Sequence, residues 1–331
     1  MLKENIKMYD QILHMKKVTC VLFFLILLSC NSENKMKAEI EKTVVALDIV
    51  RFDRAFAEAT PDDLPNLRKQ YPYLFPAPDS VWIAKMQDSL QRVLFKEVGV
   101  VFEDSNSLDV ELTHLFKHIQ YYFPEQEAPK VLMVTNDVRY NDRIIFADSL
   151  LFISLDNYLG SDHEFYGGFQ TYISKGLDKK YIISDVVSAF AKKVIPRPRD
   201  KTFLARMIYF GKELYLKDVL IPSETDAIKI GYDQAELDWA KANEEPIWRN
   251  FIEQEHLYST SNDLNLRFLD LTPFSKFGLE LDNESPGRLG RYIGWQIVRS
   301  FMKRNDNISL KQLLTIPETE IFKKSNYKPK N

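Results

Sequence analysis

The chain has 331 residues, and its 44 Lys and Arg against 47 Asp and Glu give a formal net charge of −3. Apolar residues make up 45% and charged residues 27%, which is ordinary globular usage and excludes a disordered, collagen-like or multi-span membrane protein. Nucleic-acid binding needs a basic face, so this balance predicts no nucleic-acid partner. Only 11 glycines argue against a glycine-rich phosphate loop.

The first thirty residues have the pattern of a secretory signal. Lys16 and Lys17 precede an apolar run at 18–28, and Ser29 and Cys30 follow it. The run is too short to span a bilayer, which needs roughly 20 apolar residues, so it is typical of a signal-peptide core. We therefore predict a signal peptide over residues 1–29. Translation from Met15 is an alternative start, because residues 1–14 have no signal character.

The end of this signal, LLSC at 27–30, resembles a bacterial lipobox. Cleavage before Cys30 and acylation of its thiol, with palmitate among the chains, would anchor the protein stably in a membrane at about 0.8 kcal/mol per buried CH₂. A plain secretory signal with an incidental cysteine is the alternative. Cys20 leaves with the signal, so the mature fold has no disulfide, no catalytic cysteine and no thiolate metal ligand. Asn31 and the absence of a following acidic run favour an anchor that faces the periplasm.

Beyond the anchor, the pattern predicts a polar tether over 30–42 and one globular domain over 43–331. The expected fold is α+β: a single, mostly helical domain around a small sheet. Apolar patterning predicts strands at 44–50, 130–135, 142–148 and 150–155, with Asp148 and Ser149 as a turn. It predicts helices that start near 51 and within 61–65, and others over 80–94, 107–119, 181–194, 203–220, 234–251 and 287–303.

Histidines do not form a convincing metal site. His114 and His118 are one helical turn apart, but no third ligand is evident, so we interpret them as a partly buried structural pair. His163 begins a His-Glu pattern whose second histidine is replaced by Gly167, which favours a loop or cap. Nucleophile elbows, P-loops and dinucleotide motifs are absent from the sequence, and no spacing identifies an acid/base pair. No metal, cofactor or catalytic residue is predicted.

Two arginine-bearing segments are candidate binding surfaces. Arg197 and Arg199 alternate with prolines in a stiff loop that could dock an anionic partner, the alternative being helix termination with solvated charge. The second segment, 282–298, could form a partner groove lined by Arg288, Arg291 and Trp295.

The same segment has a structural interpretation. Gly290 and Gly294 share one helix face, and a glycine inside a helix costs about 1 kcal/mol relative to alanine. Tight packing of this helix against the core would compensate for that cost.

Several segments together resemble the gliding-motility lipoproteins of the GldB type. They are the lipobox at Cys30, RFDR at 51–54, FKHIQYYFP at 116–124, DSLLFISLD at 148–156, YLGSDH at 158–163, LARMIYFGK at 204–212 and ELDNESPGR at 280–288. The resemblance covers the chain from Met15 onward. It implies a cell-envelope lipoprotein needed for gliding, working as a non-catalytic binding or scaffold component near the motility and type IX secretion machinery, with partners there.

A remoter likeness is to zincin metallopeptidases, whose strands are followed by a His-Glu-x-x-His helix and a second helix that supplies a glutamate. In that layout Ser184 and Ser188 would take the histidine positions, Asp185 the general base and Phe210 the glutamate. Hydroxyls and a phenyl ring do not hold Zn²⁺, so this would be a degenerate, binding-only peptidase scaffold. The alternative function is an envelope hydrolase acting on peptide or glycan through an active site that spacing does not identify.

Overall fold

The computed structural model describes residues 35–104, 106–279 and 282–329, so the predicted signal peptide and Cys30 lie outside the described residues. The chain divides into two units, Met1–Val45 and Ala46–Asn331. In the first, residues 35–42 are helical where a polar tether was expected. The described part contains no helix with the length and apolarity needed to cross a bilayer. All that follows concerns the second unit.

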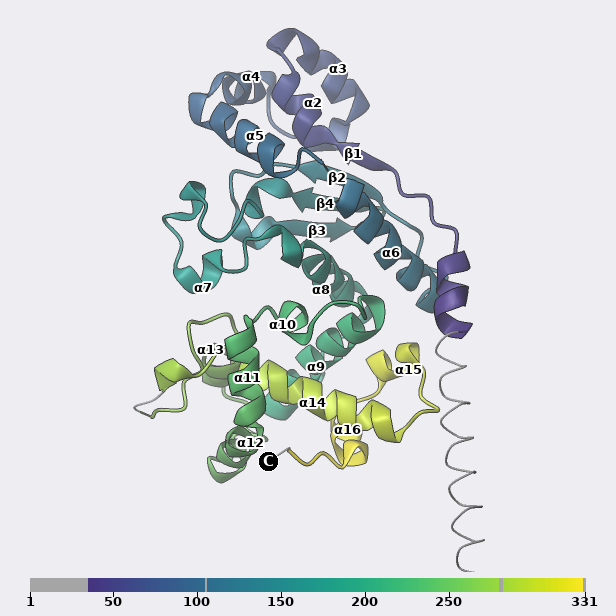
Figure 1. Cartoon of the computed structure of the whole chain (residues 1–331), viewed down its shortest axis with the longest axis vertical. Helices are drawn as coiled ribbons and strands as arrows, with labels where there is room; N and C mark the ends of the chain where they lie inside the picture. The colour runs from purple at the N-terminus through teal and green to yellow at the C-terminus, as the bar shows by residue number, and fades with distance from the viewer. Residues whose placement is uncertain (1–34, 105, 280–281, 330–331) are drawn as a thin grey trace, which may run out of the picture. The chain divides into compact units, whose positions relative to one another are not determined.

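A four-stranded mixed sheet forms one part of this unit, in the order β1-β2-β4-β3 (Figure 1). The strands are β1 (Ile49–Arg51), β2 (Lys130–Val134), β3 (Ile144–Ala147) and β4 (Leu150–Ser154). β1, β2 and β4 are parallel, and β3 is an antiparallel edge strand joined to β4 by the predicted turn, where Asp148 has a φ of 48°. The last three predicted strands are confirmed, whereas β1 is shorter and later than the predicted 44–50.

The N-terminal helices pack on the β1 side of the sheet. They are α2 (Phe52–Glu58), α3 (Leu64–Gln70), α4 (Asp79–Gln87) and α5 (Ser89–Val101). Phe52 and Phe56 of α2 join Phe75 and Leu132 in an apolar cluster that holds these helices to β2. The helix predicted over 80–94 is two helices, because the Asp88 side chain accepts a hydrogen bond from the Gln91 N–H and begins α5 there.

Two helices cover the other side of the sheet, α6 (Asn106–Tyr122) and α8 (Ile182–Val194), with the short α7 (Thr171–Ser174) between them. The predicted apolar face of α6 is confirmed, since Leu108, Leu112, Leu115 and Ile119 are all buried. α8 packs along β3 and carries one face into the C-terminal half. This places α8 between the sheet and the remaining helices (Figure 1).

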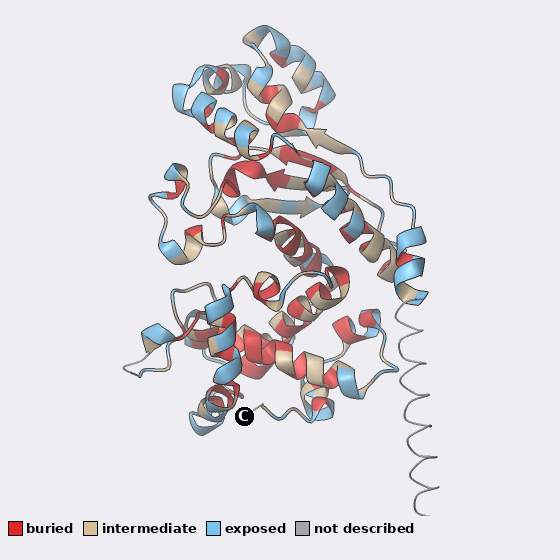
Figure 2. Cartoon of the chain, in the orientation of Figure 1, coloured by how far each residue is buried: buried red, intermediate tan, exposed pale blue. Residues whose placement is uncertain are grey.

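The C-terminal half consists of helices and loops, with no strand among its described residues. Its elements are α9 (Phe203–Leu220), α10 (Asp226–Ile230), α11 (Gln234–Ala242), α12 (Glu244–Glu253), α13 (Asp263–Phe268), α14 (Leu289–Arg304), α15 (Leu310–Thr315) and α16 (Glu318–Ser325). The predicted helices at 203–220 and 287–303 are confirmed, whereas 234–251 is interrupted at Asn243. Figure 2 shows α14 buried along most of its length, in contact with α9 and α16.

The contact between α9 and α14 depends on two glycines. A Cβ at Gly294 would overlap the backbone carbonyl of Met207, and a Cβ at Gly211 would overlap the backbone of Gly294. Because backbone cannot move aside as a flexible side chain can, only glycine allows the two helices to approach this closely. At Gly290 an added Cβ would lie 2.9 Å from the Phe268 carbonyl oxygen. The interpretation of the helical glycines as close-packing positions is confirmed.

Gly294→Ala is therefore expected to lower the free energy of unfolding by about 3 kcal/mol or to prevent folding, the upper range for overpacking a core. Urea denaturation of the full chain would measure it. Gly99→Ala in α5 is the matched control, because a Cβ there meets nothing within 4 Å and should raise stability by about 0.5–1 kcal/mol. Equal behaviour of the two variants would contradict the role given to Gly294.

Candidate functional site

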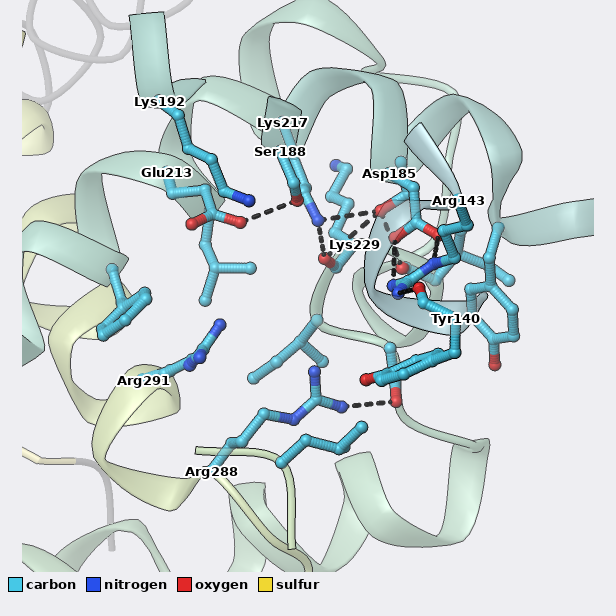
Figure 3. Close-up of a pocket in the computed structure, with 18 residues that line it drawn as sticks. Tyr140, Arg143, Asp185, Ser188, Lys192, Glu213, Lys217, Lys229, Arg288 and Arg291 are labelled. Carbon is cyan, nitrogen blue, oxygen red and sulfur yellow. Dashed lines mark hydrogen bonds and ion pairs between the residues drawn. The ribbon is translucent and has the colours of Figure 1, made fainter. Parts of the chain in front are cut away.

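A polar cavity of about 280 Å³ lies where α8, α9 and α14 meet the start of β3 (Figure 3). Its charged side chains come from segments far apart in the sequence. The cations are Arg143, Lys192, Lys217, Lys229, Arg288 and Arg291, and the acids are Asp185 and Glu213. The lining is therefore strongly cationic in a chain whose net charge is slightly negative.

Only some of these cations form ion pairs. Arg143 pairs with Asp185 at 2.7 Å, and Lys229 pairs at 3.2 Å with Asp218, which lies outside the lining. Within the described residues, the other four cations of the lining have no carboxylate at ion-pair distance. Two of these four extend into the cavity from the start of α14: Arg288, which directly precedes the helix, and Arg291 in its first turn (Figure 3).

Asp185 is held in place on one wall of the cavity. Its carboxylate accepts hydrogen bonds from Arg143 Nε at 2.7 Å and Nη2 at 3.2 Å, and from the Tyr158 hydroxyl at 2.9 Å. Tyr158 is fully buried, and burial raises the pKa of its hydroxyl well above the ordinary value. The carboxylate is therefore engaged by three donors and is poorly placed to take a proton from a ligand.

Lys217 is a buried ammonium group with neutral partners. Its residue is 5% exposed, and Nζ donates to Ser184 Oγ and to the Lys229 carbonyl oxygen, both at 2.9 Å. Burial lowers the pKa of Lys217 to about 8, against the smaller opposing effect of Glu213. The group is still mainly protonated at neutral pH, so it places a positive charge beside the cavity.

Arg291 is held by a stacking contact on α9. Its guanidinium lies 3.8 Å from the centroid of the Phe210 ring, and Nε donates to the Leu269 carbonyl oxygen. Burial lowers the pKa of Arg291 to about 10, so the group stays charged at neutral pH. The stacking fixes the plane of the guanidinium and leaves its terminal N–H groups toward the cavity lining.

Arg288 is the residue before α14 and has an uncommon backbone conformation. Its φ of 61° is left-handed, which non-glycine residues rarely adopt, and such positions cluster at functional sites. Nη2 donates to the Gly231 carbonyl oxygen at 2.8 Å, whereas Nε is buried without a hydrogen-bond partner. A buried donor without an acceptor is costly, and the remaining terminal nitrogen, Nη1, is the group that Arg288 directs into the cavity.

Glu213 is the one acid of the lining that forms no ion pair in the described residues. It accepts a hydrogen bond from Ser188 Oγ at 2.7 Å. Its charge acts on both Lys217 and Arg291, partly offsetting the lowering of their pKa by burial. The cavity thus combines an excess of positive charge with one carboxylate that can accept a further hydrogen bond.

The comparison with family models gives one match, described as gliding motility protein GldB, over residues 33–329. The chain belongs to the GldB family. A role in gliding motility and lipoprotein character fit this family. Neither the curated proteins nor the solved structures contain a significant match to the chain.

In this GldB-family protein, all four residues at the degenerate zincin positions line the cavity. They are Ser184, Asp185, Ser188 and Phe210. They supply two hydroxyls, an ion-paired carboxylate and a ring. Among the described residues, no group of three His, Cys, Asp or Glu side chains could hold a metal ion.

The predictions for the two arginine-bearing segments have different outcomes. Arg288 and Arg291 line the cavity, but Trp295, expected beside them in a groove, is fully buried, and its indole N–H donates to Asp218 at 2.8 Å. It offers no surface to a ligand. Arg197 is exposed and lines a neighbouring, more open cavity of about 640 Å³, whereas Arg199 is exposed and lines neither cavity.

The histidines lie outside the cavity. His163 caps a 3₁₀ turn by accepting the Phe165 N–H, as predicted. His118 contacts the His114 carbonyl oxygen at 2.9 Å within α6; His118 is partly buried, but His114 is exposed, so the pair is less buried than expected.

Sequence reasoning missed Lys217, Glu213, Arg143 and Lys229. A usable signal existed for two of them: Glu213 and Lys217 are one turn apart in the apolar helix at 203–220, on the same face as Phe210. Charged residues on an otherwise apolar face are expensive and often mark a site. Arg143 and Lys229 gave no such signal, because both lie near short polar segments.

Lys217 predicts a pH dependence of stability. Its folded pKa of about 8 is below the ordinary 10.5, so above pH 8 the unfolded chain binds more protons than the folded one. Burial of this charge destabilises the fold fully below pH 8, and the penalty falls as pH rises. From pH 7.5 to 9.5 Lys217 should add about 2 kcal/mol to the free energy of unfolding.

Urea denaturation at the two pH values would measure this gain, which Lys217→Met should lose. Lys192→Met, an exposed lysine at the rim of the same cavity, is the control and should keep it. If wild type and Lys217→Met gain equally, the buried charge assigned to Lys217 is wrong.

Proposed function

We propose that this chain is a lipid-anchored cell-envelope protein needed for gliding motility, and that it acts by binding rather than by catalysis. Family membership supports the motility role. The lipobox supports acylation at Cys30, and the absence of an acidic run after Asn31 supports an anchor facing the periplasm. Its expected partners are components of the gliding and type IX secretion machinery.

The cationic cavity is the main observation that supports the proposed binding role. Lys217, Arg288 and Arg291 are directed at one space and are not paired with acids in the described structure. Guanidinium groups recognise carboxylate and phosphate groups through paired N–H donors, so the cavity suits an anionic group of a partner or ligand.

The residues of the cavity do not favour hydrolysis. Asp185, at the position of a peptidase base, is bound by Arg143 and Tyr158, and Glu213, which accepts a hydrogen bond from Ser188 Oγ, also faces the cations of the lining. Ser184, Asp185, Ser188 and Phe210 line one cavity, and the degenerate, binding-only peptidase scaffold stays a proposal that no match to a solved structure supports. Hydroxyls and a ring in those places do not bind Zn²⁺.

Replacing the chromosomal copy with Arg291→Gln should abolish colony spreading, because the substitution removes a cavity charge without large loss of volume. Protein level and membrane fractionation should stay at wild-type values. Arg249→Gln, which alters an exposed arginine paired with Glu245 on α12, is the control and should spread normally. Normal spreading of the Arg291→Gln strain would show that the charge of this cavity is not needed for gliding motility.

Anchoring is tested at the thiol itself. Cys30→Ser should leave an uncleaved or soluble precursor that takes up no palmitate label in growing cells. Cys20→Ser changes the other cysteine, within the signal peptide, and should still yield a labelled, membrane-bound protein. A labelled Cys30→Ser protein would show that acylation occurs elsewhere.

A further inference from the structure

We propose that the cavity binds a phosphate monoester, with Lys217, Arg288 and Arg291 holding the phosphoryl group and Glu213 accepting a hydrogen bond from the rest of the ligand. The inference rests on the proposed function, because it names the class of ligand that the cavity binds.

The charges of the cavity match a dianion. Lys217, Arg288 and Arg291 supply three positive charges with no carboxylate at ion-pair distance in the described structure, and Glu213 supplies one negative charge. A surplus of two positive charges therefore remains within the cavity, before Lys192 at the exposed rim is counted. A phosphate monoester carries a charge of about −1.5 to −2 at neutral pH, whereas a carboxylate or a phosphodiester carries only one negative charge.

Two cations elsewhere in this fold are neutralised by acids. Lys212, which is 1% exposed, pairs with Glu318 at 2.8 Å, and Arg299 forms ion pairs with both Asp218 and Asp226. Buried charge without a partner is strongly unfavourable, which explains those pairs. Arg54 and Arg206 are half-buried without an ion pair in the described residues, but each stands apart from other such cations and donates to neutral oxygens. Lys217, Arg288 and Arg291 instead lie together around one cavity, as expected where the compensating charge comes from a ligand.

The donors of the three cations are available to phosphoryl oxygens. Arg288 uses only Nη2 in a hydrogen bond, and Arg291 uses only Nε, so each keeps terminal N–H donors for a ligand. Lys217 has three N–H donors and directs two of them to Ser184 and to the Lys229 carbonyl oxygen. In Figure 3, Arg288 and Arg291 approach the cavity from α14 and Lys217 from α9, so a ligand would be held from two sides.

Glu213 further restricts which phosphate monoesters the cavity can bind. A carboxylate next to bound phosphate is repulsive unless the ligand offers it a donor, so the ester should carry a hydroxyl or amine beside the phosphoryl group. Ser188 Oγ already donates to one oxygen of Glu213 at 2.7 Å, which leaves acceptor capacity on the carboxylate. A cavity of about 280 Å³ has room for a phosphorylated polyol of this kind.

Isothermal titration calorimetry of the full-length acylated chain in detergent would test the ligand class. Methyl phosphate and methyl sulfate have the same shape but differ by one charge at pH 7.5, so methyl phosphate should bind at least tenfold more tightly. Glycerol 3-phosphate should bind more tightly than methyl phosphate, because its hydroxyl reaches Glu213. Absence of binding by millimolar methyl phosphate, or equal affinity for methyl sulfate, would overturn the proposal.

Three cavity variants and one control variant localise the binding. Arg288→Gln and Arg291→Gln should each weaken glycerol 3-phosphate binding at least tenfold, and Arg249→Gln should leave it unchanged. Glu213→Gln should strengthen methyl phosphate binding and remove the preference for glycerol 3-phosphate, which a merely structural role for Glu213 would not produce. Thermal unfolding confirms that each variant is folded. Unchanged affinity in both arginine variants would mean that the phosphate binds elsewhere, and the proposal would fail.

Octanoyl lysophosphatidic acid, which keeps one free glycerol hydroxyl for Glu213, separates the two sources of such a group. Binding tenfold tighter than glycerol 3-phosphate identifies a lipid head group, and equal or weaker binding identifies a soluble ester; either result supports the phosphoryl site. The ligand class and the motility role fail separately. If phosphates do not bind but Arg291→Gln still abolishes spreading, only the ligand class is wrong. If glycerol 3-phosphate binds but Arg291→Gln cells spread normally, only the motility role is wrong.

Discussion

The backbone contact between α9 and α14 is the constraint on which the rest of the C-terminal half depends. Gly211 and Gly294 let the two helices approach until only glycine fits, and the contact sets their axial register. α9 carries Glu213 and Lys217, and α14 carries Arg291, so the same register brings these charges around one cavity. The close packing of these two helices therefore also determines where the polar groups of the cavity lie.

The cations of the domain fall into two groups: those that form ion pairs within the fold, and those of the cavity that do not. Arg299 is held by two aspartates and Lys212 by a glutamate, so these cations fit the ordinary rule that a buried charge is paired. Lys217 and Arg291 have pKa values lowered by burial, and neither forms an ion pair in the described structure. A fold that retains such a cost at one cavity gives up stability there, which is expected of a binding site.

For a GldB-family chain, this arrangement gives a physical basis for a binding role. The family match indicates a role in gliding motility, and the cationic cavity is the place where we propose that an anionic partner or ligand is recognised. Ser184, Ser188, Asp185 and Phe210 line the same cavity: the two serines donate hydrogen bonds, Asp185 accepts them and Phe210 is a stacking surface. Phe210, for example, fixes the Arg291 guanidinium by lying 3.8 Å beneath it. The side chains at these positions hold neighbouring charged groups of the cavity in place.

Local patterning was sufficient for most helices and for β2, β3 and β4, because periodic apolar faces such as Leu108, Leu112 and Leu115 record burial directly. It also identified the helical glycines and two arginines of the cavity. The helix break at Asp88 was missed, since a cap decided by one hydrogen bond leaves the periodicity unchanged. The break at Asn243, which has no side-chain cap hydrogen bond, was missed as well. Only the tertiary structure decided that Arg143, Lys217 and Glu213 share a cavity with Arg291 and that Trp295 does not. Distances between residues so far apart in the sequence are set by how whole helices pack, and no local pattern encodes them.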